Sequence, residues 1–347
     1  MNNQVLKEDI RLFAEHFELW EQLRGKSFLI TGATGLIGAV MIKCLVELNR
    51  KYRLDATLIA VVRDMDKARN IFGSDFEAIV FIQRPLMQIC PETIGQNINY
   101  IIHLASPTNG KYMERYPVET FSLAFESTKS LLDYARLKRC EGIVYVSSLE
   151  YYGQILEEEI VTEDVQGFID RNSPRSSYPL GKRAAEYLCY SYAYEYGVSA
   201  KMARLTQTFG AGISSTDNRV FAQFARSVAS EQDIVLHTSG ESAKPYCYTT
   251  DAVSAILYIL LKGGKGEAYN VANEETYISI KGMAEYLKYH FNPNINVRIE
   301  LNDDMGYAPV TKLRLSTKKL QSIGWSPKVD NYEMYNRLIA YLKKNDE

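Results

Sequence analysis

Tyr178 and Lys182 are the two residues of this sequence whose types and spacing best suit acid–base chemistry. They are four positions apart, so their side chains would share one face of a helix. A phenol titrates near pH ~10, and a neighbouring ammonium group favours the phenolate. Such a base could remove the proton of a sugar hydroxyl while a hydride leaves the same carbon. Because the chain contains 25 tyrosines, chance is the alternative explanation when this spacing stands alone.

A glycine-rich segment near the amino terminus indicates where a hydride acceptor would bind. Residues 26–30 have the composition of a short buried strand, and Thr31–Gly38 follows with the spacing G-x-x-G-x-x-G before an apolar helical pattern. Glycines permit a tight turn and a close backbone approach, and the N–H groups of a helix N-terminus bind a pyrophosphate. A glycine turn with only a structural role is the alternative. We expect a dinucleotide to contact Gly32, Thr34, Gly35, Leu36, Ile37 and Gly38.

Two serines and a glutamate end a second apolar strand, which we expect over residues 142–147. This strand runs into Ser147 and Ser148, and Glu150 lies two residues further on. A hydroxyl at this edge of a sheet could hydrogen-bond both a substrate oxygen and the phenol of Tyr178. The alternative is that the serines only satisfy backbone groups at the end of the strand.

The order of the expected elements indicates an α/β fold. After the first strand, five more strands are expected, at residues 57–62, 77–83, 99–105, 142–147 and 199–205, with helices between them at residues 64–72, 114–138 and 179–196. The helix over 114–138 contains Pro117, where it could kink or break. Strands and helices that alternate in this way predict a doubly wound parallel sheet of the Rossmann type.

The pattern changes after Gly210 to helices separated by short strands and turns. These helices are expected at residues 219–230, 249–261, 280–289 and 332–343. They predict a smaller α/β lobe that closes over the carboxyl edge of the sheet, where such folds bind ligands. The expected domains are an N-terminal amphipathic helix (1–24), a dinucleotide-binding domain (25–205) and a mainly substrate-binding lobe (206–347) that is interleaved with it.

Composition and charge exclude several classes of protein. The 347-residue chain has a net charge of −2, which gives no electrostatic basis for binding nucleic acid or an anionic membrane. No apolar run approaches the ~20 residues of a membrane span. Five scattered cysteines, and charged residues at positions 7–9 where a signal peptide would be apolar, predict a cytoplasmic protein. Four histidines without ligand spacing predict no metal site.

Taken in order, these segments resemble the extended short-chain dehydrogenase/reductase family, in its NAD-dependent epimerase and dehydratase branch. The resemblance covers nearly the whole chain after residue 24. The segments 175–197 and 217–220 are most similar to those of the UDP-glucuronate decarboxylases of this family. Besides the glycine segment and the Tyr178/Lys182 pair, the matching motifs are His103–Pro107, Ser147–Gly153, Arg204–Gly210, Tyr248–Asp251 and Tyr269–Val271.

The resemblance implies roles for four residues. Tyr178 would deprotonate the 4-hydroxyl of a sugar, and Lys182 would lower the pKa of Tyr178 and hold the nicotinamide ribose. Ser148 would hydrogen-bond the 4-oxygen. Glu150 stands where dehydratases and decarboxylases carry a carboxylate that acts at C5 or beside the leaving carboxylate. For Glu150, a surface or supporting glutamate is the alternative.

The resemblance also implies a nicotinamide dinucleotide as the cofactor. The second strand of such proteins typically ends in an acidic residue that binds the adenosine ribose of NAD. Here Arg63 and Asp64 follow that strand. Asp64 at the ribose would favour NAD, whereas Arg63 would accept the 2′-phosphate of NADP. Further cofactor contacts are expected from Leu104, Ala105 and Ser106.

Several positions depart from the family pattern. Leu149 stands where dehydratases have Asp and decarboxylases have Ser, and Gln83–Pro85 replaces an aspartate near the adenine. Gln207 replaces an asparagine that touches substrate or pyrophosphate. Lys244 replaces a phosphate-binding arginine, so it offers a point charge rather than a fork.

The implied substrate is a nucleotide-diphosphate sugar, converted through a 4-keto intermediate by decarboxylation, dehydration or epimerisation. An NADPH-dependent reductase of a keto nucleotide sugar is the alternative, and a non-catalytic nucleotide sensor is a third hypothesis. Helices 114–138 and 178–196 carry more Leu, Phe and Tyr than one core face needs, which predicts a homodimer. Expected substrate contacts come from Ser148, Gln207, Arg219 and Lys244, with Arg314 as a further cation and Tyr246 or Tyr248 near the base or sugar.

Overall fold

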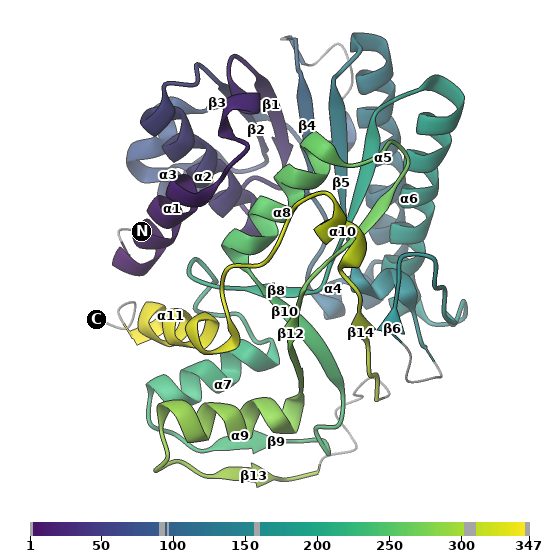
Figure 1. The fold of residues 1–347 in the computed structure, drawn as a ribbon. Coiled ribbons are helices and arrows are strands. Elements are labelled where there is room, and N and C mark those ends of the chain that lie inside the picture. Colours follow the sequence, from purple (N-terminus) through teal and green to yellow (C-terminus); the bar gives the residue numbers. More distant parts are fainter. Residues whose placement is uncertain (1–2, 90–93, 96, 156–159, 302–309, 344–347) are drawn as a thin grey trace.

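The computed structural model describes residues 3–89, 94–95, 97–155, 160–301 and 310–343, and it confirms the doubly wound α/β fold (Figure 1). Seven strands form the main sheet in the order β11-β7-β5-β4-β1-β2-β3, and every neighbouring pair is parallel. Most residues of the central strands are buried, as expected for a parallel sheet with helices on both faces. The strands are β1 (Ser27–Thr31), β2 (Thr57–Val62), β3 (Val80–Gln83), β4 (Tyr100–His103), β5 (Gly142–Ser148), β7 (Ala200–Leu205) and β11 (Ala268–Val271).

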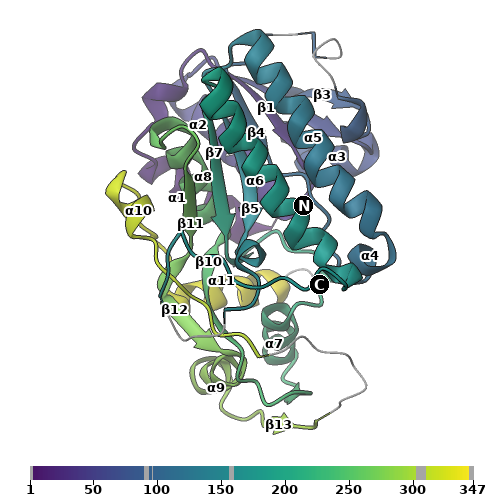
Figure 2. The same cartoon turned by 90° about the vertical axis from the view of Figure 1, so that its right-hand side faces the viewer.

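Two layers of helices cover this sheet (Figures 1 and 2). One layer contains α5 (Pro117–Lys138) and α6 (Ser177–Tyr196), and the other contains α2 (Leu36–Tyr52), α3 (Met65–Phe72) and α8 (Thr249–Lys262). Successive strand side chains point to opposite faces, so each strand serves both layers. Phe28 and Ile30 of β1 belong to the core that includes α2 and α8, whereas Leu29 belongs to the core that includes α5 and α6.

The helix predicted over residues 114–138 is divided at Pro117. The short helix α4 (Gly110–Arg115) ends just before this proline, and α5 begins with it. A proline fits the first position of a helix because its missing N–H would have no intrahelical partner there. The division lets α4 pack against residues 174–176 and against α6, the helix that contains Tyr178.

The N-terminal segment is a helix followed by a turn rather than the single amphipathic helix expected within residues 1–24. The helix α1 (Gln4–His16) packs against α2, α8 and the last helix, α11 (Asn331–Lys343), and η1 (Trp20–Leu23) is a separate 3₁₀ turn. Asp9 of α1 is buried, and its carboxylate accepts hydrogen bonds from Tyr248 Oη at 2.6 Å and Arg337 Nη1 at 2.7 Å. Burial nevertheless raises the pKa of Asp9 to about 6.

The C-terminal part of the chain builds most of a second lobe, which lies below the main sheet in Figure 1. The parts of the chain interleave, because β11 and α8 follow residue 205 yet complete the main sheet and one of its helix layers. The domain boundaries remain a prediction. The lobe contains the sheet β8 (Gln207–Phe209), β10 (Ala243–Tyr248) and β12 (Asn273–Ser279), the pairs β9 (Ile234–Leu236) with β13 (Val297–Ile299) and β6 (Ile160–Val161) with β14 (Arg314–Leu315), and the helices α7 (Val220–Ala229), α9 (Ile280–Phe291) and α11. The short helix α10 (Lys318–Ser322) instead packs against β11 of the main sheet.

Candidate active site

The glycine loop between β1 and α2 is a tight cradle. Gly32 has φ +68°, and a Cβ atom there would lie 2.8 Å from the backbone nitrogen of Ala105. A Cβ atom on Gly38 would lie 2.2 Å from the carbonyl oxygen of Gly32. Gly35 caps α2 without a side-chain hydrogen bond, and the first turn of α2 carries no acidic residue. Its N–H groups and helix dipole therefore favour an anion, and the cradle fits the pyrophosphate of a dinucleotide.

The other residues expected to contact the cofactor border the same loop. The hydroxyl oxygen of Ser106 is buried, and its interaction with the phenol of Tyr178 contributes to lowering the pKa of that phenol. Thr34, Leu36 and Ile37 are half-buried in the loop and the first turn of α2, and Leu104, Ala105 and Ser106 are half-buried directly after β4.

His103 ties the glycine loop to the neighbouring strand and helix. Its Nδ1 atom lies 2.7 Å from the hydroxyl oxygen of Thr31, and its Nε2 atom lies 3.3 Å from that of Ser127 on α5. Burial, and to a lesser degree the charge of Lys182, lowers the pKa of His103 to about 3. A neutral imidazole can donate with one nitrogen and accept with the other, so His103 can bridge two hydroxyls without carrying charge.

Tyr178, Lys182 and Ser148 meet at the carboxyl end of β5. Tyr178 is the second residue of α6, Lys182 follows one turn later, and Ser148 is the last residue of β5. The Lys182 ammonium lies 5.5 Å from the centroid of the Tyr178 ring and donates a 2.8 Å hydrogen bond to the carbonyl oxygen of Val146. Ser148 interacts with the phenol of Tyr178 through a hydrogen bond.

Burial and neighbouring charges determine the pKa of Tyr178. Burial and the negative charge of Glu150 raise it to about 12, although the hydrogen bond from Ser148 lowers it. Burial lowers the pKa of Lys182 to about 8, against the charges of Glu186 and Glu150, which raise it. In the protein without a ligand, burial and Glu150 therefore outweigh the groups that lower the pKa of Tyr178. The role of Lys182 in lowering this pKa remains a prediction.

Glu150 lies beside Tyr178, and Arg175 holds its carboxylate. Glu150 belongs to the 3₁₀ turn η4 (Leu149–Tyr152), directly after β5. The Nη2 atom of Arg175 is 2.8 Å from each carboxylate oxygen, and the guanidinium carbon lies 5.5 Å from the centroid of the Tyr178 ring. Arg175 lies in a segment that matches the family but is not among the predicted site residues. Its position three residues before Tyr178 was the available signal, since that spacing places two side chains on one side of a helical turn.

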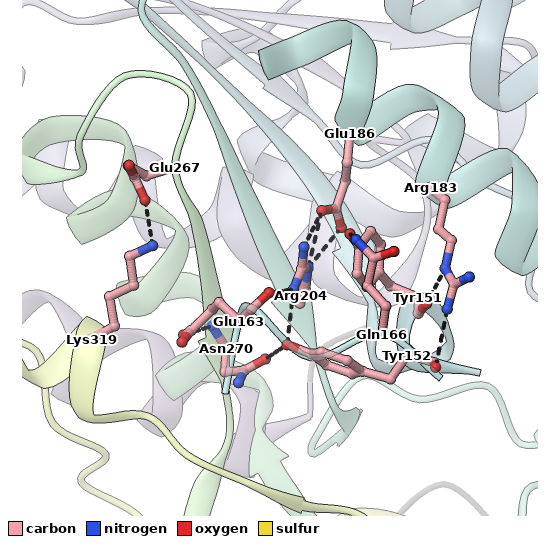
Figure 3. A network of polar contacts seen from close by, with 10 residues as sticks. All are labelled: Tyr151, Tyr152, Glu163, Gln166, Arg183, Glu186, Arg204, Glu267, Asn270 and Lys319. Atoms are coloured by element: carbon pink, nitrogen blue, oxygen red, sulfur yellow. Dashed lines mark hydrogen bonds and ion pairs between the residues drawn. The ribbon is translucent and has the colours of Figure 1, made fainter. Parts of the chain in front are cut away.

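A buried polar network holds Tyr151 and Tyr152 (Figure 3), which belong to the same turn η4 as Glu150. Arg204 of β7 pairs with Glu186 of α6 at 2.8 Å, and its guanidinium carbon lies 3.5 Å from the centroid of the Tyr151 ring. Arg204 also donates to the hydroxyl of Tyr152 at 3.1 Å, and Arg183 donates to the carbonyl oxygens of Tyr151 and Tyr152. Breaking a buried ion pair by removing one partner costs about 3–5 kcal/mol, so this turn is firmly positioned.

Lys244 and Gln207 approach the site from the second lobe. The pKa of Lys244 is lowered by burial and raised by the charge of Glu150, so the lysine is within electrostatic reach of that carboxylate. Gln207 is half-buried on β8, which pairs with β10, the strand of Lys244. The structure thus brings Lys244 toward the Tyr178 group and places Gln207 on the adjacent strand.

The two other predicted cations have partners in the second lobe. Arg219 caps α7 and forms an ion pair with Asp217, and its guanidinium carbon lies 4.7 Å from the centroid of the Phe221 ring. Arg314 of β14 stacks over Tyr277, with its guanidinium carbon 4.5 Å from the ring centroid. If Arg219 contacts the substrate, its guanidinium must therefore bind the substrate while it remains paired with Asp217.

Tyr246 and Tyr248 do not lie where a base or a sugar could stack. Both side chains are buried in the core of the molecule, and the hydroxyl of Tyr248 donates to Asp9 of α1. They are two positions apart on β10, so both rings point to the same face of the sheet, and both belong to the main apolar core. The expectation that one of them contacts the nucleotide or sugar is wrong.

The carboxyl ends of β2 and β3 carry two exposed arginines. Arg63 follows β2, and Arg84 follows β3 with its backbone N–H donating to Val62 at 3.0 Å. Neither guanidinium pairs with another described residue. Asp64 is the N-cap of α3, and its carboxylate accepts the N–H of Lys67 at 2.9 Å. The acidic group predicted to bind the ribose thus caps a helix, whereas Arg63 is free to meet a ligand.

Two other features of the described residues bear on the sequence predictions. In the described ranges, no helix is long and apolar enough to cross a membrane. Within the same ranges, no three His, Cys, Asp or Glu side chains gather in a way that could hold a metal ion.

Comparison with known proteins links this site to a family of enzymes. The model of the NAD dependent epimerase/dehydratase family matches residues 28–272. UDP-glucuronic acid decarboxylase 1 of Xenopus tropicalis is 26% identical over 327 residues, which are 93% of this chain and 73% of that protein. The dTDP-D-glucose 4,6-dehydratase of Homo sapiens is 25% identical over 345 residues, which are 94% of each chain.

A solved structure supports the same fold. The UDP-glucose 4-epimerase of Thermotoga maritima, determined with UDP-glucose, superposes with a TM-score of 0.78 and 19% identity. The match covers 92% of this chain and all of the epimerase chain. At 19% identity, the superposition shows that the two proteins share a fold.

Proposed function

Because this chain belongs to the NAD dependent epimerase/dehydratase family, we propose that it modifies a nucleotide-diphosphate sugar through a 4-keto intermediate. The observation that carries the proposal is the meeting of Ser148, Tyr178 and Lys182 at the carboxyl end of β5, with Glu150 beside them. A hydroxyl, a buried phenol and an ammonium are the groups needed to take a proton from a sugar hydroxyl. An adjacent carboxylate provides for a second step.

Each residue has a defined task in this mechanism. Ser148 hydrogen-bonds the 4-oxygen of the sugar, and Tyr178 receives the proton of the 4-hydroxyl. A nicotinamide dinucleotide held by the glycine loop would supply the hydride acceptor for C4, and the positive charge of its oxidised form would favour the phenolate of Tyr178. Lys182 adds positive charge behind the phenol. The ketone acidifies C5, and Glu150 is placed to accept a proton there or to lie beside a leaving group.

The charge of the site supports an anionic substrate. Arg175 contacts Glu150, and the charge of Glu150 also acts on Lys182 and Lys244. Three cations thus surround one carboxylate. The surplus positive charge favours an anionic substrate, as a nucleotide-diphosphate sugar is.

A panel of nucleotide sugars tests the proposal. The purified protein is incubated with uridine, cytidine, thymidine and guanosine diphosphate sugars, with and without added NAD or NADP, and the products are identified by mass spectrometry. We expect one class of nucleotide sugar to be converted without net consumption of cofactor. The Tyr178→Phe variant is the matched control. Conversion by this variant at the wild-type rate would refute the assignment.

A one-way NADPH-dependent reductase of a keto nucleotide sugar is the second candidate. It is favoured by Arg63 and Arg84, which stand exposed at the strand ends, and by Asp64, which is engaged as a helix cap. The same panel distinguishes the two functions. A reductase oxidises one NADPH for each product molecule, whereas the first function returns the hydride to the sugar.

A homodimer through the outer faces of α5 and α6 is also part of the proposal. Large apolar side chains stand exposed there, among them Val118 (72%), Leu137 (65%), Tyr187 (70%) and Tyr194 (83%). Exposed large apolar side chains on two helices that pack against each other are typical of a protein interface. A monomeric mass by light scattering at micromolar concentration would contradict it. The cytoplasmic location predicted from the cysteines remains a proposal, which cell fractionation tests.

A further inference from the structure

The guanidinium of Arg175 uses only part of its bonding capacity within the protein. A guanidinium carries five N–H donors, which lie in one plane. The Nη2 atom of Arg175 meets both oxygens of Glu150. The Nη1 atom is buried and has no hydrogen-bond partner among the described residues. A buried donor on a charged group is costly to leave unpaired, so a ligand oxygen at this place would be bound strongly.

The position of Nη1 indicates which part of a ligand it would meet. Arg175 lies over the ring of Tyr178 and is bonded to Glu150. In the proposed function, the phenol of Tyr178 is the base for the 4-hydroxyl, and Glu150 acts at C5. The guanidinium therefore lies on the C4–C5 side of the sugar. The substituent carried by C5 is the group nearest to it.

We propose that Arg175 contacts the substrate through its Nη1 atom, which donates a hydrogen bond to an oxygen of the substituent on C5 of the sugar. The Nη2 atom meanwhile holds Glu150 in position for the same carbon. Arg175 is then a specificity-determining residue: it distinguishes sugars that carry a carboxylate or a hydroxymethyl group on C5 from pentoses that carry only hydrogen there. This inference rests on the proposed function, because it assumes that the sugar binds over Tyr178.

A set of three ligands isolates this contact. UDP-glucuronate, UDP-glucose and UDP-xylose differ at C5 by a carboxylate, a hydroxymethyl group and a hydrogen atom. If the panel identifies another base, the matching nucleotide sugars replace them. Dissociation constants are measured by calorimetry with saturating cofactor in the Tyr178→Phe background, which keeps the ring under Arg175 and leaves the ligands unreacted. The nucleoside diphosphate alone gives the baseline for binding without a sugar.

The variant Arg175→Lys keeps a positive charge that can pair with Glu150 but removes the second arm. We expect it to weaken UDP-glucuronate by roughly 10- to 150-fold, the range for loss of one charge-assisted hydrogen bond. UDP-glucose should be weakened less, by about fivefold, and UDP-xylose by less than about twofold. Arg175→Met, which also loses the charge, should give the same order of effects with larger values for UDP-glucuronate.

The control variant is Arg183→Lys. Arg183 supports the turn of Glu150 from behind and belongs to the same helix as Tyr178. If Arg175 acted only by holding that turn, both variants would weaken all three ligands equally, and the inference would be wrong. Equal affinities of Arg175→Lys and its parent for all three ligands would also overturn it. Failure of the parent protein to bind any of the three would instead count against the proposed function, and the inference would fall with it.

Discussion

The end of β2 gives a prediction about the cofactor that can be worked out from the structure. Arg63 is exposed there, and Arg84 stands at the end of the neighbouring strand β3. Asp64, the residue that would accept the ribose hydroxyls of NAD, is bonded to the N–H of Lys67 as the cap of α3. Loss of such a cap costs about 1 kcal/mol. Binding of NAD through Asp64 would therefore have to offset that cost, whereas binding of NADP through Arg63 would not.

The perturbation is Arg63→Gln, which keeps the aliphatic stem and removes the charge. A hydrogen bond to a charged group contributes about 1.5–3 kcal/mol, so the variant should lose roughly 10- to 150-fold in affinity for NADP. Affinity for NAD, which has no 2′-phosphate, should change by less than about threefold. Arg84→Gln should act in the same direction. The assay is fluorescence or calorimetric titration of the purified protein with each dinucleotide at fixed ionic strength.

Arg53→Gln is the matched control. Arg53 is an exposed arginine that caps α2, at the opposite end of β2 from the cofactor site. It should leave both affinities unchanged, apart from a small effect of net charge. The reasoning would be refuted if Arg63→Gln weakened NAD and NADP to the same extent, or if Asp64→Asn reduced NAD affinity by more than about tenfold, since that would show Asp64 at the ribose.

Three other residues lead to predictions. Tyr178→Phe should lower turnover by about 10²- to 10⁴-fold, the usual share of a general base, while cofactor affinity stays within about threefold; unchanged turnover in a steady-state assay would remove Tyr178 from the mechanism. Glu150→Gln should allow oxidation but block the following step, so that the 4-keto sugar accumulates in rapid-quench mass spectrometry; complete product formation would reduce Glu150 to a structural role. His103, whose pKa falls from 6.5 to about 3 in the folded protein, binds a proton only when unfolded between these values. Stability should therefore fall on acidification through this window, by up to about 1.4 kcal/mol per pH unit, and urea unfolding of His103→Asn should lack that slope.

The sequence motifs predicted the fold and the composition of the site because those depend on local patterns. The glycine spacing required a tight turn, and the structure shows the reason: Cβ atoms at Gly32 and Gly38 would collide with backbone. The four-residue spacing of Tyr178 and Lys182 placed both on α6. These are short-range consequences of helical and turn geometry, which a single sequence carries directly.

Electrostatic properties and long-range partners were not predictable in the same way. The direction of the pKa of Tyr178 depends on burial and on Glu150, which is 28 positions away in the chain and reaches the site through another element. Arg175 could be recognised as a site residue only from its contact with Glu150 in the structure. Tyr248 matched a family motif, yet its hydroxyl is bonded to Asp9, a residue at the other end of the chain that no local pattern connects to it.

The contact between α1 and α11 has a consequence for how the protein is made. Asp9, near the start of the chain, is bonded to Tyr248 and Arg337, and the edge strand β11 of the main sheet comes from residues 268–271. During synthesis on the ribosome, α1 can pack against α2 early, but the Asp9 carboxylate lacks its partners Tyr248 and Arg337 until these residues have emerged. The main sheet likewise remains one strand short until β11 has been made. Domains generally fold as units as their chain is completed. We expect the nascent dinucleotide-binding half to depend on chaperones. Chains that leave the ribosome before residue 337 has been made should be sensitive to proteases.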